Sequence, residues 1–385
     1  GIRDAQESRG LGDVYKRQSS LSPGHPVSPS PRLPVSIWLE VLPALVFLLV
    51  CTGSLLWSTD RAFIAADGTA LWRISLREYR VTVIEPFLLY PLLFLAFRRR
   101  PERAWWPVDA LVLSGALVGL GGIVQVLTPS LHAEIADGVR RATSVYGTFS
   151  ANALALFLGR VLSPAAAGAL FLPSGRRRWL YLAAVLVLLA SFGLTYSRAG
   201  YIALALVLLF YGLVHRRLVL WIELGLGAVG ALLAVVVGAL GRLLALDTFR
   251  NRLVMWQNTW QLVRERPLLG YGLDAYYHVY SRRFPKAEAY WNPNNGVLEF
   301  WTRLGLMGLM AGAWLYGAFF VRAARAYRRL QEPAGRVLLL GLMGSVLYAL
   351  VHGFLDGQFF APDWAATFWL AYGLVAVLGG RVEQR

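Results

Sequence analysis

Long apolar segments separated by short polar connections dominate this chain. An α-helix needs about 20 apolar residues to cross the ~30 Å hydrocarbon layer of a membrane. Ten segments fit or approach that length, near residues 36–57, 81–97, 107–127, 148–173, 179–196, 200–215, 218–244, 297–321, 337–356 and 362–380. The pattern therefore predicts an all-α fold, a polytopic membrane helix bundle of about 10 transmembrane helices. The segments 81–97 and 200–215 are short, so re-entrant helices remain an alternative there.

The connections between these segments alternate in charge. Basic clusters lie at Arg98–Arg100 with Arg103, Arg176–Arg178, His215–Arg217, Arg322 to Arg329, and Arg381 with Arg385. By the positive-inside rule these connections face the cytoplasm, and both termini lie there too. The opposite, extracytoplasmic face then carries the connections 58–80 and 128–147, the turn Ser197–Gly200, and a long loop over residues 245–296.

The long extracytoplasmic loop has features of its own. Apolar residues recur at helical spacing from Leu253 to Val263, with Trp256 and Trp260 on one face, which predicts an interfacial helix. Pro267 and Gly270 end that pattern. The loop holds seven basic residues against four acidic ones. Long loops often escape the positive-inside rule; the alternative is that an anionic ligand binds there.

Domain organisation follows from the same pattern. Residues 1–18 are polar and unlike the rest of the chain, and residues 19–34 are rich in Pro and Ser. We therefore expect residues 1–35 to be a non-native or disordered leader. Residues 36–385 are expected to form a single polytopic domain.

Composition narrows the class of protein. The chain is 57% hydrophobic and 16% charged, against the ~25% charged residues of an ordinary soluble domain. The net charge of +16 would indicate nucleic acid in a soluble protein, but here the bases lie between apolar runs, so no nucleic-acid partner is predicted. One cysteine, Cys51, excludes a disulfide framework and a Cys-rich metal site.

Three arginines on separate extracytoplasmic connections are candidates for ligand binding: Arg141, Arg198 and Arg252. A guanidinium is permanently charged and pairs bidentately with phosphate oxygens. If the bundle brings these connections together, they form a diphosphate site. The structural alternatives are a snorkelling Arg198 at a helix end and a solvated Arg252. Asn152 lies within a span and needs a polar partner, either in this site or on another helix.

Four separate motifs resemble one known family. They are Arg141 followed by GTFSAN, then YSRAG, then RLVMW with PLLGYG, and NNGVLEFWTRLGLMG. The last motif has Asn295, Gly305 and Gly308 at the family's spacing. In order and spacing, the region 141–356 is similar to the O-antigen ligase and O-antigen polymerase superfamily of membrane glycosyltransferases.

The resemblance implies an enzyme of the bacterial plasma membrane with an extracytoplasmic active site. Its donor would be a glycan on undecaprenyl diphosphate, and its acceptor a hydroxyl of lipid A core, another glycan or a protein, as in lipopolysaccharide biosynthesis. Arginines matching Arg198 and Arg252 would hold the diphosphate. The donor is already activated, so neither a cofactor nor a metal is expected.

One position departs from the family pattern. Ligases place a His where this chain has Asn294, and Asn cannot accept a proton. Asn294 can still orient an acceptor by hydrogen bonding, so it stays a catalytic candidate. Glu299 is the second catalytic candidate, although its spacing to Arg303 also fits an intrahelical ion pair.

Three further residues could accept the proton of the acceptor hydroxyl in place of the missing His. Each of them also has a purely structural interpretation. Asp356 follows His352 at the outer end of a span, which fits a polar contact between helices. His278 lies in the sequence YYHVY, typical of a surface or interface, and Asp274 follows Gly272 at a turn. Asp356, with Asn152 and Asn295, is expected to support the site.

Other functions are compatible with the same pattern. A polymerase of the superfamily would share the donor, and an inactive relative would bind lipid-linked glycan without transfer. A transporter predicts inverted repeats and charged residues at the midplane, and the sequence shows neither. Gly308 and Gly312 form a GxxxG pair, which favours close helix packing.

Overall fold

The computed structural model describes residues 35–57, 63–65, 68–136, 138–143, 150–217, 219–221, 247–287, 291–357 and 359–383. The chain divides into two compact units, Gly1–Val41 and Leu42–Arg385, and the second carries every feature discussed below. Apart from Val35, the predicted leader lies outside the described residues.

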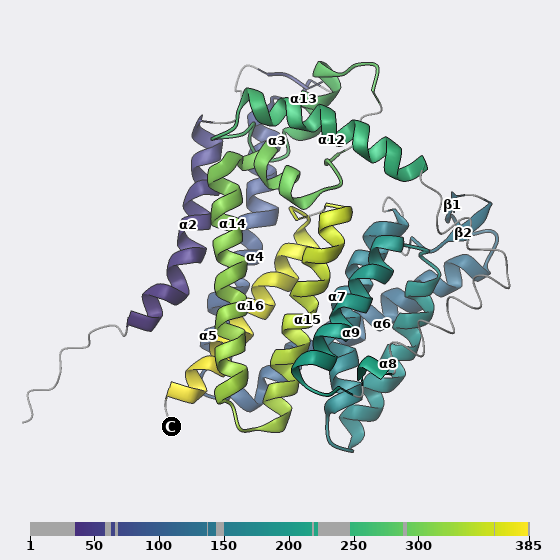
Figure 1. The fold of residues 1–385 in the computed structure, drawn as a ribbon, viewed down its shortest axis with the longest axis vertical. Coiled ribbons are helices and arrows are strands. Elements are labelled where there is room, and N and C mark those ends of the chain that lie inside the picture. Colours follow the sequence, from purple (N-terminus) through teal and green to yellow (C-terminus); the bar gives the residue numbers. More distant parts are fainter. Residues whose placement is uncertain are drawn as a thin grey trace, which may run out of the picture. The chain divides into compact units, whose positions relative to one another are not determined.

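The second unit is built mainly from helices (Figure 1). In chain order they are α2 (Val35–Trp57, which begins in the first unit), α3 (Leu71–Glu78), α4 (Glu85–Phe87), α5 (Leu89–Phe97), α6 (Trp105–Leu127), α7 (Ala151–Phe171), α8 (Arg176–Gly193), α9 (Arg198–Val214), α12 (Asp247–Glu265), α13 (Tyr276–Arg283), α14 (Gly296–Arg329), α15 (Pro333–Leu355) and α16 (Pro362–Glu383). A π-helical turn, Tyr79–Ile84, joins α3 to α4, and a 3₁₀ turn, Pro101–Ala104, precedes α6. The short antiparallel strands β1 (Glu134–Ala136) and β2 (Val139–Arg141) pair with Ile135 opposite Arg140.

Five helical stretches are long and apolar enough to cross a membrane: Leu71–Phe97, Pro101–Leu127, Ala151–Phe171, Gly296–Arg329 and Pro333–Leu355. Val41–Trp57 and Arg198–Val214 are shorter apolar helices. The predicted all-α membrane class is therefore confirmed, whereas the number of about ten spans stays a prediction. Each predicted span except 218–244 coincides with a helix, and most of 218–244 lies outside the described residues.

Helices α7 and α15 form the centre of the bundle. In the most apolar 18 residues of each helix, 83% of the residues are buried in α7 and 78% in α15. The corresponding share in Pro101–Leu127 is 28%. α15 packs along α7 and α9, and α7 also packs against α8. The outer helices expose apolar side chains such as Leu113 and Leu186, as a lipid-facing surface requires.

The predicted helical loop segment is present as α12, which packs against α14. Figure 1 shows α12 and α13 lying across the end of the bundle where α14 begins. The helix α12 ends before Pro267, as the sequence predicts. Its Trp260 ring meets Trp301 of α14 edge-on, with the ring centroids 5.4 Å apart.

The predicted continuous helix 297–321 is wrong in one respect, because α14 breaks at Gly305. That residue has φ 67° and ψ −168°, a conformation that glycine adopts without strain. A Cβ atom there would lie 2.1 Å from the carbonyl oxygen of Leu268. The break therefore depends on glycine both for its dihedral angles and for the close approach of another backbone segment.

The segment Pro267–Gly272 fills this break. Its Pro267 carbonyl accepts from the backbone N–H of Leu306 at 2.9 Å, and its Tyr271 N–H donates to the Thr302 carbonyl at 2.8 Å. The inserted segment thus supplies hydrogen-bond partners to backbone groups that the break frees. At the GxxxG pair, the atoms nearest to an added Cβ belong to the same helix: Leu304 at Gly308, and the Phe300 ring at 2.8 Å from Gly312.

Candidate functional site

The last turn of α15 is a meeting point for distant parts of the chain. The carbonyl of Phe354 accepts from Asn295 Nδ2 at 3.2 Å, and the carbonyl of Leu355 accepts from an Arg252 guanidinium nitrogen at 2.5 Å. The side chain of Asp356 is hydrogen-bonded by Asn152. Carbonyls at a helix C-terminus lack intrahelical partners and carry partial negative charge, so donors and a cation stabilise them.

Arg141 extends this network to two further loops. Its guanidinium donates to Asn152 Oδ1 at 3.2 Å and to the Thr195 carbonyl at 2.8 Å, and it forms an ion pair with Glu134 at 2.7 Å. The other Glu134 oxygen accepts from the N–H of Ala151, the first residue of α7. The polar partner that the sequence requires for Asn152 is therefore Arg141 on one side and Asp356 on the other.

Arg198 is the first residue of α9 and is half-buried. Ser197 caps this helix, since its hydroxyl accepts from the Gly200 N–H at 3.3 Å. The same hydroxyl lies 3.5 Å from Nε2 of the buried His352, one turn before the end of α15. The start of α9 is thus fixed next to α15. Arg141 also contacts the carbonyl of Thr195, which lies three residues before Arg198 in the chain.

Asp356 has an unusual environment for a carboxylate. It is only 5% exposed, and its Oδ2 is buried with no hydrogen-bond partner among the described residues. Burial raises the pKa of this carboxyl group to about 6, and the charges of Arg252 and Arg141 together with the Asn152 hydrogen bond limit the rise. A buried carboxylate oxygen without a hydrogen-bond partner costs free energy.

Asn294 and Asn295 occupy a tight turn before α14. Asn294 has φ 47°, a left-handed conformation that Asn tolerates better than most residues. Its N–H donates to Asn292 Oδ1 at 2.8 Å, and Trp256 of α12 donates to the Pro293 carbonyl at 2.9 Å. Asn295 caps α14 by accepting from the Leu298 N–H at 3.1 Å. Asn294 is half-buried, and its neighbour Asn295 contacts the end of α15 through the Phe354 carbonyl.

Glu299 belongs to a second polar cluster. Its Oε1 pairs with Arg303 at 3.2 Å, the intrahelical ion pair that the spacing predicts, and its Oε2 accepts from the Phe359 N–H at 3.0 Å. Arg303 also pairs with Glu78 at 3.4 Å. Both carboxylate oxygens of Glu299 are therefore engaged, and the side chain is 1% exposed.

Of the remaining candidate bases, Asp274 lies within electrostatic range of Glu299, Arg303 and Glu78. Asp274 has φ 54° in the turn after Gly272, which fits its structural interpretation. His278 contacts aromatic rings, with its centroid 6.2 Å from that of Phe63 and 5.4 Å from that of Tyr277.

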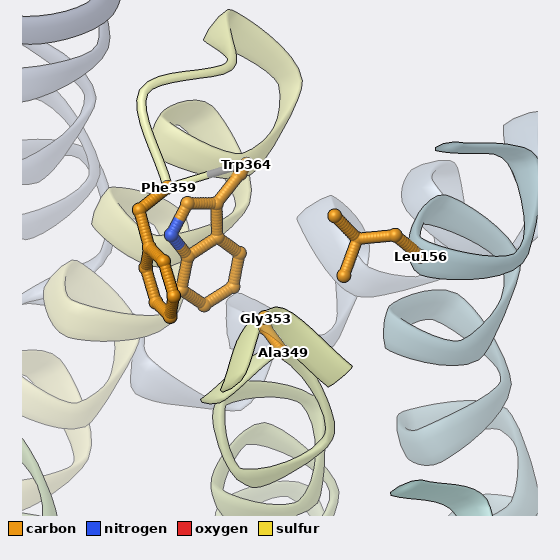
Figure 2. Close-up of a pocket in the computed structure, with 5 residues that line it drawn as sticks. All are labelled: Leu156, Ala349, Gly353, Phe359 and Trp364. Carbon is orange, nitrogen blue, oxygen red and sulfur yellow. The ribbon is translucent and has the colours of Figure 1, made fainter. Parts of the chain in front are cut away.

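The sequence interpretation missed one buried charge. Arg160 of α7 has no exposed surface, forms an ion pair with Asp363 of α16, and lies over the Trp364 ring at 5.4 Å. An arginine inside a predicted span is the signal that could have found it. Trp364 also lines a small apolar pocket. Figure 2 shows Phe359 and Trp364 on one side of this pocket and Leu156 on the other, with Gly353 and Ala349 between them.

No group of three or more His, Cys, Asp or Glu residues arranged to hold a metal occurs in the described part of the chain. The side chains around the α15 turn supply positive charge, amide groups and one carboxylate with a free oxygen. Such a set suits an anionic group next to a hydroxyl that must lose its proton.

The fold and this site define a multi-pass helical membrane protein with an arginine-rich polar site at one end of its bundle. Residues 183–313 match the family model described as O-antigen ligase. The O-antigen ligase of Salmonella typhimurium (strain LT2) is 26% identical over 306 residues, covering 72% of this chain and 72% of that protein. Both comparisons support the O-antigen ligase family and confirm the resemblance indicated by the sequence motifs. Arg198, Arg252, Asn294 and Glu299 lie inside the matched region.

Proposed function

We propose that this protein transfers a glycan from an undecaprenyl-diphosphate carrier to an acceptor hydroxyl at a bacterial inner membrane, as in lipopolysaccharide biosynthesis. One observation carries the proposal: Arg252 and the Arg141–Asn152 pair, from distant parts of the chain, converge on the last turn of α15. The start of α9 with Arg198 is fixed to the same helix through Ser197 and His352.

The proposed chemistry follows from these side chains. Arg198, Arg252 and Arg141 bind the diphosphate through charge-assisted hydrogen bonds. As the bond between the sugar and the diphosphate breaks, negative charge grows on the phosphate oxygens, and fixed guanidinium groups stabilise it. Asn294 orients the acceptor through its amide. The carrier diphosphate is already a good leaving group, so neither ATP nor a metal ion enters the proposed reaction.

The proposed topology combines the helices with the charge pattern. Residues 36–385 form one polytopic domain with cytoplasmic termini, and the α15 turn faces the extracytoplasmic side, where the positive-inside rule places the loop 245–296. There the site meets a lipid-linked donor in the outer leaflet and an acceptor glycan, lipid or protein.

Transfer by purified protein tests the proposal. The protein is reconstituted in vesicles with an undecaprenyl-diphosphate glycan, and product is followed by gel mobility or mass spectrometry. Arg198→Ala should lose donor binding and transfer while inserting normally. Arg328→Ala is the matched control, since Arg328 is exposed in the last turn of α14. Unchanged transfer by Arg198→Ala would remove Arg198 from the proposed site.

A polymerase of the same superfamily is the second candidate, and Asn294 in place of the ligase His is the observation that favours it. Both reactions use the same donor. Supplying either a second lipid-linked glycan or a lipid A core acceptor separates them, because a polymerase elongates the first and a ligase modifies the second. A protein that binds donor and modifies neither is an inactive relative.

A further inference from the structure

The free oxygen of Asp356 has no structural explanation within the fold. Two other carboxylates among the described residues are engaged: Glu134 binds Arg141 and the Ala151 N–H, and Glu299 binds Arg303 and the Phe359 N–H. Oδ2 of Asp356 is buried and has no partner among the described residues. Such groups are rare because losing water without a replacement costs free energy.

The neighbours of Asp356 hold the carboxylate in place without neutralising it. Asn152 hydrogen-bonds the side chain, and Asn152 is itself fixed by Arg141 at 3.2 Å. Arg252 donates to the carbonyl of Leu355. In the described structure, the two guanidinium groups thus make their hydrogen bonds to other oxygens. One carboxylate oxygen, although buried, is thereby left without a hydrogen-bond partner among the described residues, next to the groups proposed to bind the donor diphosphate.

We propose that Asp356 is the catalytic base, whose free Oδ2 accepts the proton of the acceptor hydroxyl during glycan transfer. This inference rests on the proposed function. In the step, the acceptor oxygen forms a bond to the sugar C1 carbon while the bond from C1 to the phosphate oxygen breaks. The electron pair of that bond leaves with the carrier diphosphate, and the hydroxyl proton moves to Oδ2. Asp356 later releases the proton to water.

Alternative bases in the same region fit this role less well. Asn294 cannot accept a proton. Both oxygens of Glu299 are already engaged. His352 lies one turn before the helix end with no exposed surface, its Nε2 against the Ser197 hydroxyl and its Nδ1 without a partner among the described residues. Asp356, in contrast, ends the helix at the turn where the other site residues meet.

The charges around Asp356 suit a base that works near neutral pH. The groups facing it are Arg252 of α12, Arg141 of β2, Glu134 of β1 and Tyr348 of α15, together with the amide of Asn152. With a pKa of about 6, the group is mostly ionised at pH 7 and remains basic enough to accept a proton.

Asp356→Asn tests the role directly, because Asn has nearly the same shape and keeps a hydrogen-bonding amide. Transfer should fall by about 10²–10⁴-fold, the usual contribution of a general base, while donor binding changes less than about threefold. Asp109→Asn is the matched control. Asp109 is hydrogen-bonded to Tyr181 and Arg177 near the start of α6, and its loss should leave transfer unchanged. Full transfer by Asp356→Asn would overturn the inference.

The pH dependence of the wild-type protein tests the same role without a variant. Single-turnover transfer should rise about tenfold per pH unit below about 6 and level off above it. A flat profile between pH 5 and 8 would overturn the inference even if Asp356→Asn does not fold. Wild-type protein that transfers no glycan at any pH would overturn the proposed function and the inference with it, whereas an active wild type with a flat profile overturns the inference alone.

Discussion

The guanidinium of Arg252 donates to the carbonyl oxygen of Leu355 at 2.5 Å, although 103 residues separate them. This hydrogen bond joins the helix α12 to the last turn of α15. Asn295 joins the same turn from a third direction, through the carbonyl of Phe354. Since a helix C-terminus is the negative end of its dipole, a cation there is favourable before any ligand binds.

Substituting Arg252 should weaken donor binding. Arg252→Ala removes a fixed positive charge and the contact with Leu355, so the Kd for a lipid diphosphate should rise about 10–100-fold, or about 1.4–2.7 kcal/mol. Arg252→Lys should recover only part of this, because an ammonium cannot bind two phosphate oxygens in a fork. Fluorescence titration in nanodiscs measures the effect. Arg250→Ala, an exposed arginine of the same helix, is the control, and an equal loss there would mean a non-specific charge effect.

Asn294 can be tested separately as backbone and as side chain. Asn294→Gly keeps the left-handed turn, since glycine adopts φ 47° without strain, and it removes the amide. Transfer should then fall at least about tenfold with normal folding if the amide orients the acceptor. Asn294→His restores the family residue and should raise transfer or leave it unchanged. A loss of transfer with His would show that the amide has a specific role of its own.

Gly305→Ala should strongly destabilise the protein. A left-handed residue other than glycine costs about 1–3 kcal/mol, and the new Cβ would also lie 2.1 Å from the Leu268 carbonyl oxygen. Gly317→Ala lies on the same helix, where a Cβ meets nothing within 4 Å. Thermal unfolding in detergent should therefore show a lower Tm for Gly305→Ala and an unchanged or higher Tm for Gly317→Ala. Equal Tm values would contradict the break in α14.

The cluster around Arg303 should be sensitive to the loss of its cation. Arg303→Met leaves Glu78 and Glu299 unpaired in a buried site, which costs about 3–5 kcal/mol. Adding Glu78→Gln should recover part of that stability, because it removes one uncompensated charge. The yield of folded protein and its Tm measure both effects. Arg328→Met, an exposed arginine of the same helix, provides the baseline.

Asp356 should also make stability depend on pH. Its pKa rises from the ordinary 3.8 to about 6 in the folded protein, so folding favours the protonated form. The protonated Asp356 therefore contributes up to about 3 kcal/mol to the free energy of unfolding. This contribution is fully present below pH 3.8 and is lost as the pH rises through 6. Comparing the Tm of wild type and Asp356→Asn from pH 4 to 7 isolates this contribution. A constant difference across that range would mean that the carboxyl group is not shifted.

The sequence by itself determined the class of protein and most of its helices. The length of an apolar segment predicts a membrane span because one continuous helix of about 20 residues crosses the hydrocarbon layer. The motifs around Arg198, Arg252 and Asn294 indicated the family. The ion pair of Glu299 with Arg303 also followed from spacing alone. These features depend on neighbours in the chain, so a local pattern is enough to find them.

Only the tertiary structure decided which side chains meet. The pairing of Arg160 with Asp363, the free oxygen of Asp356 beside Asn152, and the insertion of Pro267–Gly272 at Gly305 join residues that are distant in sequence. Such contacts depend on how helices pack, and packing is set by the shapes and charges of many side chains at once. For this reason the sequence could name Asp356 as one of several bases, whereas its burial and its open oxygen appear only in three dimensions.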